Sequence, residues 1–556
     1  MPQAPGGRRW GARAGAPLLG APLALAFPRP SLWWLGFVGL VPLLGLVRAA
    51  PTGREAAMLA WLGGAGFFAA VDAFLLPKVG PFVVPAALLL GAFWVPWGLL
   101  AWALLRGRLS PARVTAALVA VPSAFVTGEY LRAWPGLGGP WGLLGASQWN
   151  DLPVLALASV GGVWAVSFLL AAVNVAVGVV LAPPAPRPGP AAAQQAAPAR
   201  PGPRGRVHQL VFGGPGAGHR RGARLAAVAT LAGLAGGTLA YAALRPLPAP
   251  AGTVRVAVVQ PGVVQQPEAR FRASEAATLA LASARPDLVV WGESSVGRDP
   301  ATHPEDLARL AAAARATGAR VLVNVDAMRA SGPSAGRGSP APAVPVSGEG
   351  GGTGAGIYKT SLLVGADGPE GAYDKMRLVP FGEYVPLRRL LGWVTRVTDA
   401  AALDRRRGTR LAVLDAGPVA VGPLVCFESA FPDLARSLAD RGADLVVVQS
   451  ATTTFQRSWG PDQHASLAAV RAVESGRPVV QAAISGVSAA FDARGRRLAW
   501  YPTTWRGAAV VAVPRSGERT PYDRWGDWLP AGCCLVTLAA LGAVAGILGR
   551  GARPPS

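Results

Sequence analysis

The sequence predicts a multi-pass α-helical membrane domain joined to an α/β domain. Hydrophobic residues make up 51% of the 556 positions, more than ordinary soluble proteins contain. Apolar stretches of about 20 residues, the length needed to cross a bilayer, recur over the first 244 residues and again at the C-terminus. Between them, from about residue 250 to 527, short β-branched runs alternate with Ala-rich stretches.

We predict eight membrane spans, the first of which is short and interrupted by proline. They lie near residues 14–28, 31–49, 56–76, 82–105, 113–133, 154–182, 223–244 and 529–549. Arginine clusters flank one side of these spans, including Arg8 and Arg9 before the first and Arg550 and Arg553 after the last. The positive-inside rule assigns that side to the cytoplasm. We therefore expect both termini in the cytoplasm and residues 250–527 outside it.

The expected domain organisation follows from these spans. Residues 1–182 hold the first six spans, 223–249 the seventh, and 528–556 the eighth with a cytoplasmic tail. Residues 183–222 consist largely of Pro, Ala, Gly and Arg, so we expect a disordered cytoplasmic linker. A similar stretch at 331–356 is expected to be a disordered surface insertion in the outer domain.

Within the outer domain, buried strands are expected at 254–260, 287–291, 319–325, 411–414, 419–426 and 444–449. Helices are expected near 272–284, 303–317, 429–440 and 461–476. This alternation indicates a sheet core covered by helices.

The net charge of +23 does not indicate a nucleic-acid-binding protein. No basic-aromatic platform or helix-turn-helix pattern accompanies the charge, and much of it lies in loops between apolar stretches. The cysteines are Cys426 and the adjacent pair Cys533 and Cys534, so no disulfide framework is indicated. The four histidines do not occur at metal-ligand spacings. We expect no metal and no cofactor.

Three polar residues stand where buried strands end or soon after: Glu293, Lys375 and Cys426. A nucleophile at a strand-to-helix turn is exposed at the edge of a sheet, as catalysis needs. Taken singly, Cys426 could be a small buried core residue, Glu293 a loop carboxylate or helix cap, and Lys375 a surface lysine. The lysine is more informative, because only Lys78, Lys359 and Lys375 are lysines among 53 cationic side chains.

Glu, Lys and Cys in this order and context resemble the nitrilase, or carbon-nitrogen hydrolase, superfamily. More narrowly, the whole chain resembles the apolipoprotein N-acyltransferases. The motifs that carry this resemblance are GGPWGLLGASQ (138–148), YDKMRLVPFGEYVPL (373–387), VCFESAFP (425–432), QHASLAAVRAVESGRPVV (463–480), SGVSAAFDARG (485–495) and TPYDRWGDW (520–528). The resemblance implies a nitrilase-like αββα sandwich on the outer side of a bacterial cytoplasmic membrane.

The resemblance also implies transfer of a fatty acyl chain from a phospholipid to the α-amino group of a lipoprotein's N-terminal diacylglyceryl-cysteine. Glu293, in an apolar site that raises its pKa, would take the thiol proton of Cys426. Lys375 and the backbone N–H after Cys426 would stabilise the oxyanion. A thioester intermediate and ping-pong kinetics are expected.

Four further residues match or border positions important in that family. Glu383 and Glu428 are further acidic positions, whose alternative role is to orient the lysine or to accept from backbone donors near the turn. Phe427 stands where the family often has Tyr. Trp141 could line a lipid entrance or be an interfacial tryptophan. The chain departs from the family at SATTTF (450–455), which lacks the usual Asp and Trp.

Two other functions are compatible with parts of this pattern. A membrane-tethered nitrilase-type amidase would use the same three residues to hydrolyse small amides, although so many spans favour a lipid substrate. A non-enzymatic membrane scaffold would have no need of the three residues, and all three are present.

Overall fold

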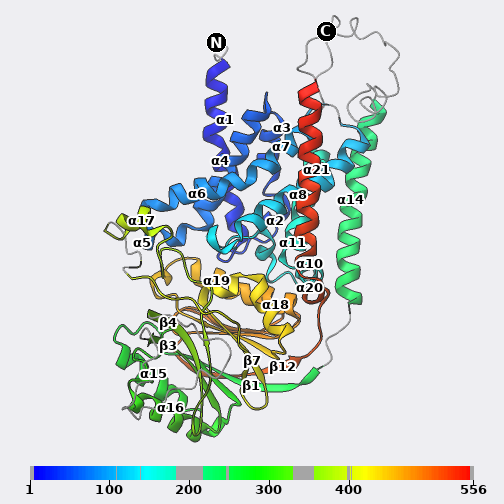
Figure 1. Cartoon of the computed structure of the whole chain (residues 1–556). Helices are drawn as coiled ribbons and strands as arrows, with labels where there is room; N and C mark the ends of the chain where they lie inside the picture. Colours follow the sequence, from blue (N-terminus) through cyan, green and yellow to red (C-terminus); the bar gives the residue numbers. More distant parts are fainter. Residues whose placement is uncertain are drawn as a thin grey trace, which may run out of the picture.

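The computed structural model describes residues 5–107, 109–137, 139–182, 217–245, 250–329, 356–396, 401 and 403–550. The predicted linker up to residue 216 and the predicted insertion up to residue 355 lie outside the described residues. A helical region and a region of two β-sheets are stacked end to end (Figure 1). Helix α1 (Pro5–Gly20) begins, and helix α21 (Trp528–Arg550) ends, on the side of the helical region remote from the sheets.

Five helical segments among the described residues are long and apolar enough to cross a membrane. They are Ala73–Leu105, Pro111–Arg132, Val163–Leu181, Arg221–Leu244 and Trp528–Gly546. The first comprises η2 (Ala73–Leu75), α5 (Leu76–Val79), η3 (Gly80–Phe82), α6 (Val83–Gly91), η4 (Ala92–Trp94) and α7 (Val95–Leu105). The next three are α8 (Pro111–Arg132), α11 (Val163–Leu181) and part of α14 (Ala217–Leu244).

The three other predicted spans coincide with shorter or less apolar helices. They are α1 with η1 (Ala21–Ala26), α2 (Leu35–Val38) with α3 (Val41–Arg48), and α4 (Gly53–Val71). In α4 the first turn is polar: Thr52 caps it, and Glu55 forms an ion pair with Arg13 of α1 at 2.6 Å. Because this first turn is charged, the apolar part of α4 is too short to count as a membrane span by composition alone. The total of eight membrane spans therefore stays a prediction.

The second region contains two six-stranded sheets. The first has the order β12 (Gly507–Ser516), β1 (Pro250–Gln260), β2 (Leu288–Trp291), β3 (Arg320–Arg329), β4 (Gly356–Gly365) and β5 (Gly368–Asp374). The second has the order β11 (Arg497–Tyr501), β10 (Ser488–Phe491), β9 (Val479–Ala483), β8 (Leu445–Ser450), β7 (Ala420–Val425) and β6 (Leu414–Asp415). Strands β1–β3 and β7–β9 are parallel within each sheet, and the outer pairs are antiparallel.

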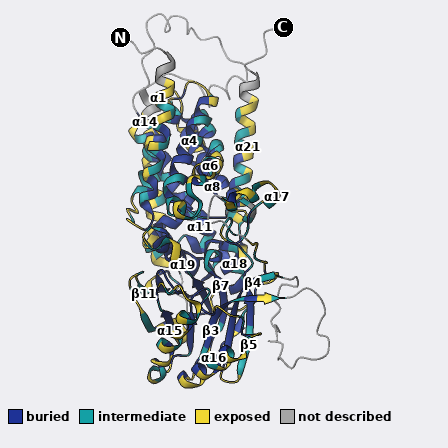
Figure 2. Cartoon of the chain, turned by 90° about the vertical axis from the view of Figure 1, so that its left-hand side faces the viewer, coloured by how far each residue is buried: buried dark blue, intermediate teal, exposed yellow. Residues whose placement is uncertain are grey.

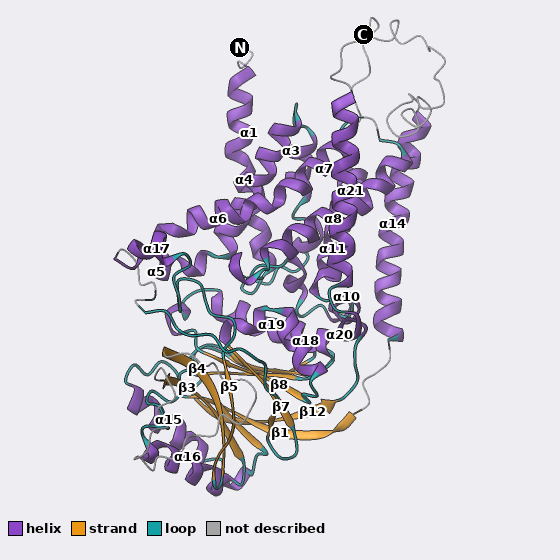
Figure 3. Ribbon diagram, in the orientation of Figure 1, coloured by secondary structure: helices purple, strands orange, loops and turns teal. Residues whose placement is uncertain are grey.

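The two sheets pack face to face between two layers of helices (Figure 3). Helices α15 (Pro267–Leu279) and α16 (Pro304–Thr317) cover the first sheet, whereas α18 (Pro432–Asp440) and α19 (Gly460–Ser475) lie between the second sheet and the helical region. Alternation along β1 produces this arrangement: Val256 and Val258 join the core between the sheets, and Ala257 and Val259 join the core under α15 and α16. Buried residues fill the central strands of both sheets, whereas β11 at the edge of the second sheet is exposed or half-buried (Figure 2).

The α/β architecture expected from the sequence is therefore confirmed as an αββα sandwich. Five of the six predicted strands match observed strands within a few residues. The run 411–414 differs, because only Leu414 and Asp415 pair there, at the sheet edge. The helix expected from residue 429 begins instead at Pro432, because η9 (Cys426–Ala430) intervenes.

Candidate active site

Cys426 lies on a strained turn directly after strand β7. Its φ of +52° is left-handed, a conformation that residues other than glycine rarely adopt. Two contacts fix the turn: the Val425 N–H donates to Glu428 at 2.8 Å, and a His464 ring nitrogen lies 2.9 Å from the carbonyl oxygen of Cys426. The half-buried thiol is thus presented at the end of a parallel strand, in the geometry of a nucleophile elbow.

Lys375 directly follows β5, and its side chain is fully buried. Its ammonium group lies 2.9 Å from the Glu383 carboxylate and 3.4 Å from Oε1 of Glu293. Glu383 is itself held by the backbone N–H of Val379 at 2.9 Å. A buried ammonium with two carboxylate partners keeps its charge, because each anion offsets part of the desolvation cost.

Glu293 follows β2 after Gly292 and faces Cys426. Its N–H donates to the Ser450 carbonyl at the end of β8, at 3.1 Å. Glycine is required before it, because a Cβ at position 292 would lie 2.1 Å from the backbone nitrogen of Ile484. The Glu293 side chain is 6% exposed and is hydrogen-bonded to the Cys426 thiol. The structure thus brings together the three residues that the sequence singles out.

The charges in this site set the resting protonation states. Burial raises the pKa of Glu293, but Lys375 and Lys359 outweigh burial, so the pKa lies below its usual value. The expectation of a raised pKa for Glu293 was therefore wrong, because its surroundings are cationic rather than apolar. Burial, and then the charge of Glu293, raise the pKa of the Cys426 thiol. Burial lowers the pKa of Lys375, but Glu383 and Glu293 reverse this and raise it. The resting site holds a neutral thiol beside an ionised carboxylate.

Glu428 holds the lysine-bearing loop against the elbow rather than contacting Lys375 directly. Its Oε1 accepts from the Tyr373 hydroxyl at 2.8 Å and from the backbone N–H groups of Met376 and Arg377 at 2.7 and 3.0 Å. Its Oε2 accepts from Val425. Of the two expectations for Glu428, this geometry matches satisfaction of backbone donors near the turn.

An aromatic cluster joins the elbow to the helical region. Trp141 lies between η5 (Pro135–Leu137) and η6 (Leu144–Gln148), and its ring stacks on Phe427 at 6.4 Å and on His464 at 6.1 Å. Phe74 of η2 lies 5.1 Å from Trp141 and 5.4 Å from Phe455. The Phe427 ring therefore contacts Trp141, for which the sequence left open a lipid entrance or an interfacial position.

The segment SATTTF takes part in the site through its backbone and Phe455. The Ala451 N–H is hydrogen-bonded to the Cys426 sulfur, and Ser450 lies 3.2 Å from His464. The segment thus contributes a backbone donor and an aromatic ring to the surroundings of the elbow, although it lacks the Asp and Trp. His464 was missed from the sequence, because a histidine in mid-helix gives no sign of contact with a distant turn.

Lys359 on β4 is the other residue that the sequence reasoning missed. It is 6% exposed, lies 2.9 Å from Asp326 and 3.8 Å from Oε1 of Glu293, and donates to Ser294. A signal was present, since Lys359 is one of only three lysines in an arginine-rich chain.

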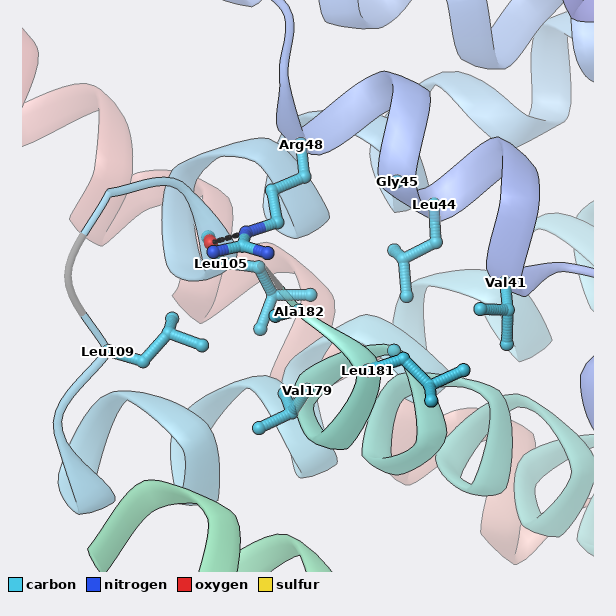
Figure 4. Close-up of a pocket in the computed structure, with 10 residues that line it drawn as sticks. Val41, Leu44, Gly45, Arg48, Leu105, Leu109, Val179, Leu181 and Ala182 are labelled. Carbon is cyan, nitrogen blue, oxygen red and sulfur yellow. Dashed lines mark hydrogen bonds between the residues drawn. The ribbon is translucent and has the colours of Figure 1, made fainter. Parts of the chain in front are cut away.

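A separate pocket of about 120 Å³ lies in the helical region (Figure 4). It is lined by Val41, Leu44, Gly45, Arg48, Leu105, Leu109, Gly178, Val179, Leu181 and Ala182. Arg48 donates to the Leu105 carbonyl at 2.5 Å. No carboxylate or thiol lines this pocket, so it is distinct from the site around Cys426.

The αββα sandwich, with Cys426, Glu293 and Lys375 brought together beyond the ends of strands from both sheets, defines a carbon-nitrogen hydrolase domain, and residues 255–520 match that family. Residues 19–176 match the apolipoprotein N-acyltransferase N-terminal domain. The chain belongs to the apolipoprotein N-acyltransferase family.

Relatives with that name align over almost the whole chain. The protein from Azotobacter vinelandii is 32% identical, with 95% of this chain and 96% of the relative covered. The relative from Geobacter metallireducens is 29% identical, with 95% and 94% covered. Among solved structures, a nitrilase-superfamily amidase from Nesterenkonia AN1 aligns with a TM-score of 0.32 and 18% identity, covering 51% of this chain and 95% of the amidase.

Proposed function

We propose that this protein transfers a fatty acyl chain from a membrane phospholipid to the α-amino group of a lipoprotein's N-terminal S-diacylglyceryl-cysteine. Cys426 is the nucleophile, Glu293 the general base and Lys375 the oxyanion stabiliser. The observation that carries the proposal is the strained elbow of Cys426, with Glu293 and Lys375 beside it and aromatic rings from the helical region above it. Family membership supplies the two substrates.

The first half-reaction forms a thioester. The proton of the Cys426 thiol passes to Glu293 as sulfur bonds to the ester carbonyl carbon of the phospholipid. Because the pKa of Glu293 is lowered and that of Cys426 is raised, a free thiolate is scarce at rest. Proton transfer is therefore coupled to attack. Lys375 and the N–H of Phe427 stabilise the oxyanion, the carbon–oxygen bond breaks, and Glu293 returns the proton to the leaving lysophospholipid oxygen.

The second half-reaction transfers the acyl group to nitrogen. The lipoprotein amine attacks the thioester carbonyl and gives a proton to Glu293. The carbon–sulfur bond breaks, and the proton returns to the Cys426 sulfur, which restores the starting thiol. Two half-reactions separated by a covalent intermediate make the kinetics ping-pong.

Purified protein incubated with a phospholipid that carries a labelled acyl chain tests the proposal. We expect label on the Cys426 peptide that hydroxylamine removes, and loss of that label in Cys426→Ala. The matched control is Cys534→Ala, a half-buried cysteine in α21 that should leave labelling unchanged. Absence of label from the unaltered protein would refute the thioester.

We also propose eight spans in the bacterial cytoplasmic membrane, with both termini cytoplasmic and residues 250–527 outside as the catalytic domain. The positions of α1 and α21 support this topology, because their terminal ends lie on the same side of the helical region, away from the sheets (Figure 1). A reporter inserted at the exposed turn Ala366–Asp367 between β4 and β5 should be active outside the cytoplasm. Cytoplasmic activity there would overturn the topology.

A membrane-tethered amidase remains the second candidate function, because its chemistry uses the same three residues. The aromatic contacts between Trp141, Phe427 and Phe74 favour the acyltransferase, since they surround the elbow with apolar surface suited to a lipid chain. Release of free fatty acid or ammonia, without transfer to a lipopeptide amine, would favour the amidase.

A further inference from the structure

Two buried lysines, rather than one, lie close to the carboxylate of the proposed general base, Glu293. Lys375 and Lys359 approach the same oxygen, Oε1 of Glu293, at 3.4 and 3.8 Å. The lysines are also joined through their backbones, since the Lys375 N–H donates to the Lys359 carbonyl at 2.8 Å. Both ammonium groups thus lie on the same oxygen of the carboxylate that neighbours the Cys426 thiol.

Lys359 also supports the turn that carries Glu293. Its ammonium group donates to the Ser294 hydroxyl, and Ser294 has a left-handed φ of +53°. The Ser294 N–H donates to the Asn324 side chain on β3 at 2.9 Å. A strained backbone of this kind persists only where surrounding contacts hold it, so Lys359 helps to fix the direction in which Glu293 points.

Asp326 forms an ion pair with Lys359 and holds its side chain in place. The two residues are direct partners in the antiparallel pair β3–β4, and Asp326 lies 2.9 Å from Lys359 and 2.9 Å from Arg405. Lys359 is thus held between Asp326 on one side and Glu293 and Ser294 on the other. The charged and titratable groups that interact with Glu293 are Lys375, Lys359, Cys426 and Asp326, together with His464 of α19.

We propose that Lys359 is a positioning residue for the acyl-transfer reaction, which orients Glu293 and keeps it ionised so that it can accept the Cys426 proton. This inference rests on the proposed function of Glu293 as general base. A compact ammonium suits the position, because it reaches Asp326, Ser294 and Glu293 from one atom, whereas an arginine fork directs its donors apart.

The proposal predicts opposite effects for two neighbouring substitutions. Lys359→Met removes a positive charge near Glu293. In a profile of the rate of acyl-enzyme formation against pH, the acid limb, where the rate falls as the pH is lowered, should therefore move up by about one pH unit. Loss of orientation should also slow the reaction at neutral pH by about 10-fold or more. Asp326→Asn removes a negative charge that faces Glu293, so the acid limb should move down or stay. Lys359→Arg retains the positive charge. Its acid limb should therefore lie closer to that of the unaltered protein than the acid limb of Lys359→Met does.

The experiment measures single-turnover labelling of Cys426 by labelled phospholipid against pH, with Lys78→Met as the matched lysine control. Alkylation of Cys426 by iodoacetamide against pH, scored on its own peptide, repeats the test without lipid. If Lys359→Met changes neither the acid limb nor the rate by more than twofold, Lys359 is not a positioning residue. Failure of the unaltered protein to form the thioester would refute the proposed function, and the alkylation profiles would still decide the role of Lys359.

Discussion

Glu428→Gln offers a quantitative test of the clamp between the elbow and the lysine loop. Glu428 is fully buried and accepts four hydrogen bonds, three on Oε1 and one on Oε2. The amide that replaces the carboxylate loses least when its NH₂ takes the Oε2 position and faces the Val425 N–H. The Val425 N–H and the new NH₂ group are then both unpaired buried donors, and leaving a buried donor unpaired costs about 1–3 kcal/mol.

The three remaining bonds also weaken, because they no longer end on a charged acceptor. Easier burial of the neutral amide offsets part of that loss. We therefore expect a net destabilisation of about 2 kcal/mol, or a fall in Tm of roughly 4–8 °C for a domain of this size.

Thermal unfolding of the detergent-solubilised protein measures this effect. Asp433→Asn is the control, because its partly exposed ion pair with Arg377 at 3.0 Å is worth less than about 1 kcal/mol. An unchanged Tm for Glu428→Gln together with a lost acyl-enzyme would refute the clamp and show that Glu428 takes part in proton transfer.

Four further outcomes are expected. Glu383→Gln removes the nearest anion from Lys375, at 2.9 Å, and should slow acyl-enzyme formation by about 10-fold or more in single-turnover labelling. Gly139→Ala places a Cβ 2.7–2.8 Å from the rings of Phe431 and Phe427 at a φ of +83°, and should lower stability by about 1–3 kcal/mol in thermal unfolding. Because the pKa of Glu293 is lowered, acyl-enzyme formation should persist until the pH falls below about 4.3, the usual value for Glu, as a rate–pH profile would show. Treatment with EDTA should leave labelling unchanged, and a loss that added metal restores would contradict the absence of a metal from the proposed mechanism.

The sequence predicted the class of each region because periodicity and apolar length are local properties. Strand β7 and the cysteine after it were found in this way, since a β-branched run followed by a turn can be recognised within one short segment of sequence. Strands β4, β5 and β9–β12 were missed. Strand β12 illustrates the reason, because its partner in the sheet lies far along the chain: Val513 of β12 lies opposite Val254 of β1.

Residues of the candidate site could be predicted from the sequence only where their residue type is unusual for this chain. Lys375 was noticed because lysine is rare in this chain, and the same criterion applied to Lys359. The direction of the pKa shift of Glu293 could not be predicted from the sequence, because it depends on both lysines lying close to that carboxylate. Their convergence on one carboxylate oxygen is set by the pairing of β4 with β3 and β5.

The charged groups and aromatic rings around Cys426 suggest how the proposed thioester would react with an amine rather than with water. The charged groups Glu293, Lys375, Glu383 and Lys359 around the thiol are all buried. Beside Phe427, the residue after the thiol, the helical region supplies the rings of Trp141 and Phe74. A thioester formed between them would have its carbonyl toward the lysine and its acyl chain toward the rings. Apolar contact with a lipid chain displaces water from that side, so an amine tethered to its own acyl chains would reach the carbonyl where a free water molecule is disfavoured. Replacing Trp141 by Ser should therefore raise hydrolysis of the acyl-enzyme relative to transfer, and an unchanged ratio of fatty acid to acylated lipopeptide would contradict this role for the aromatic cluster.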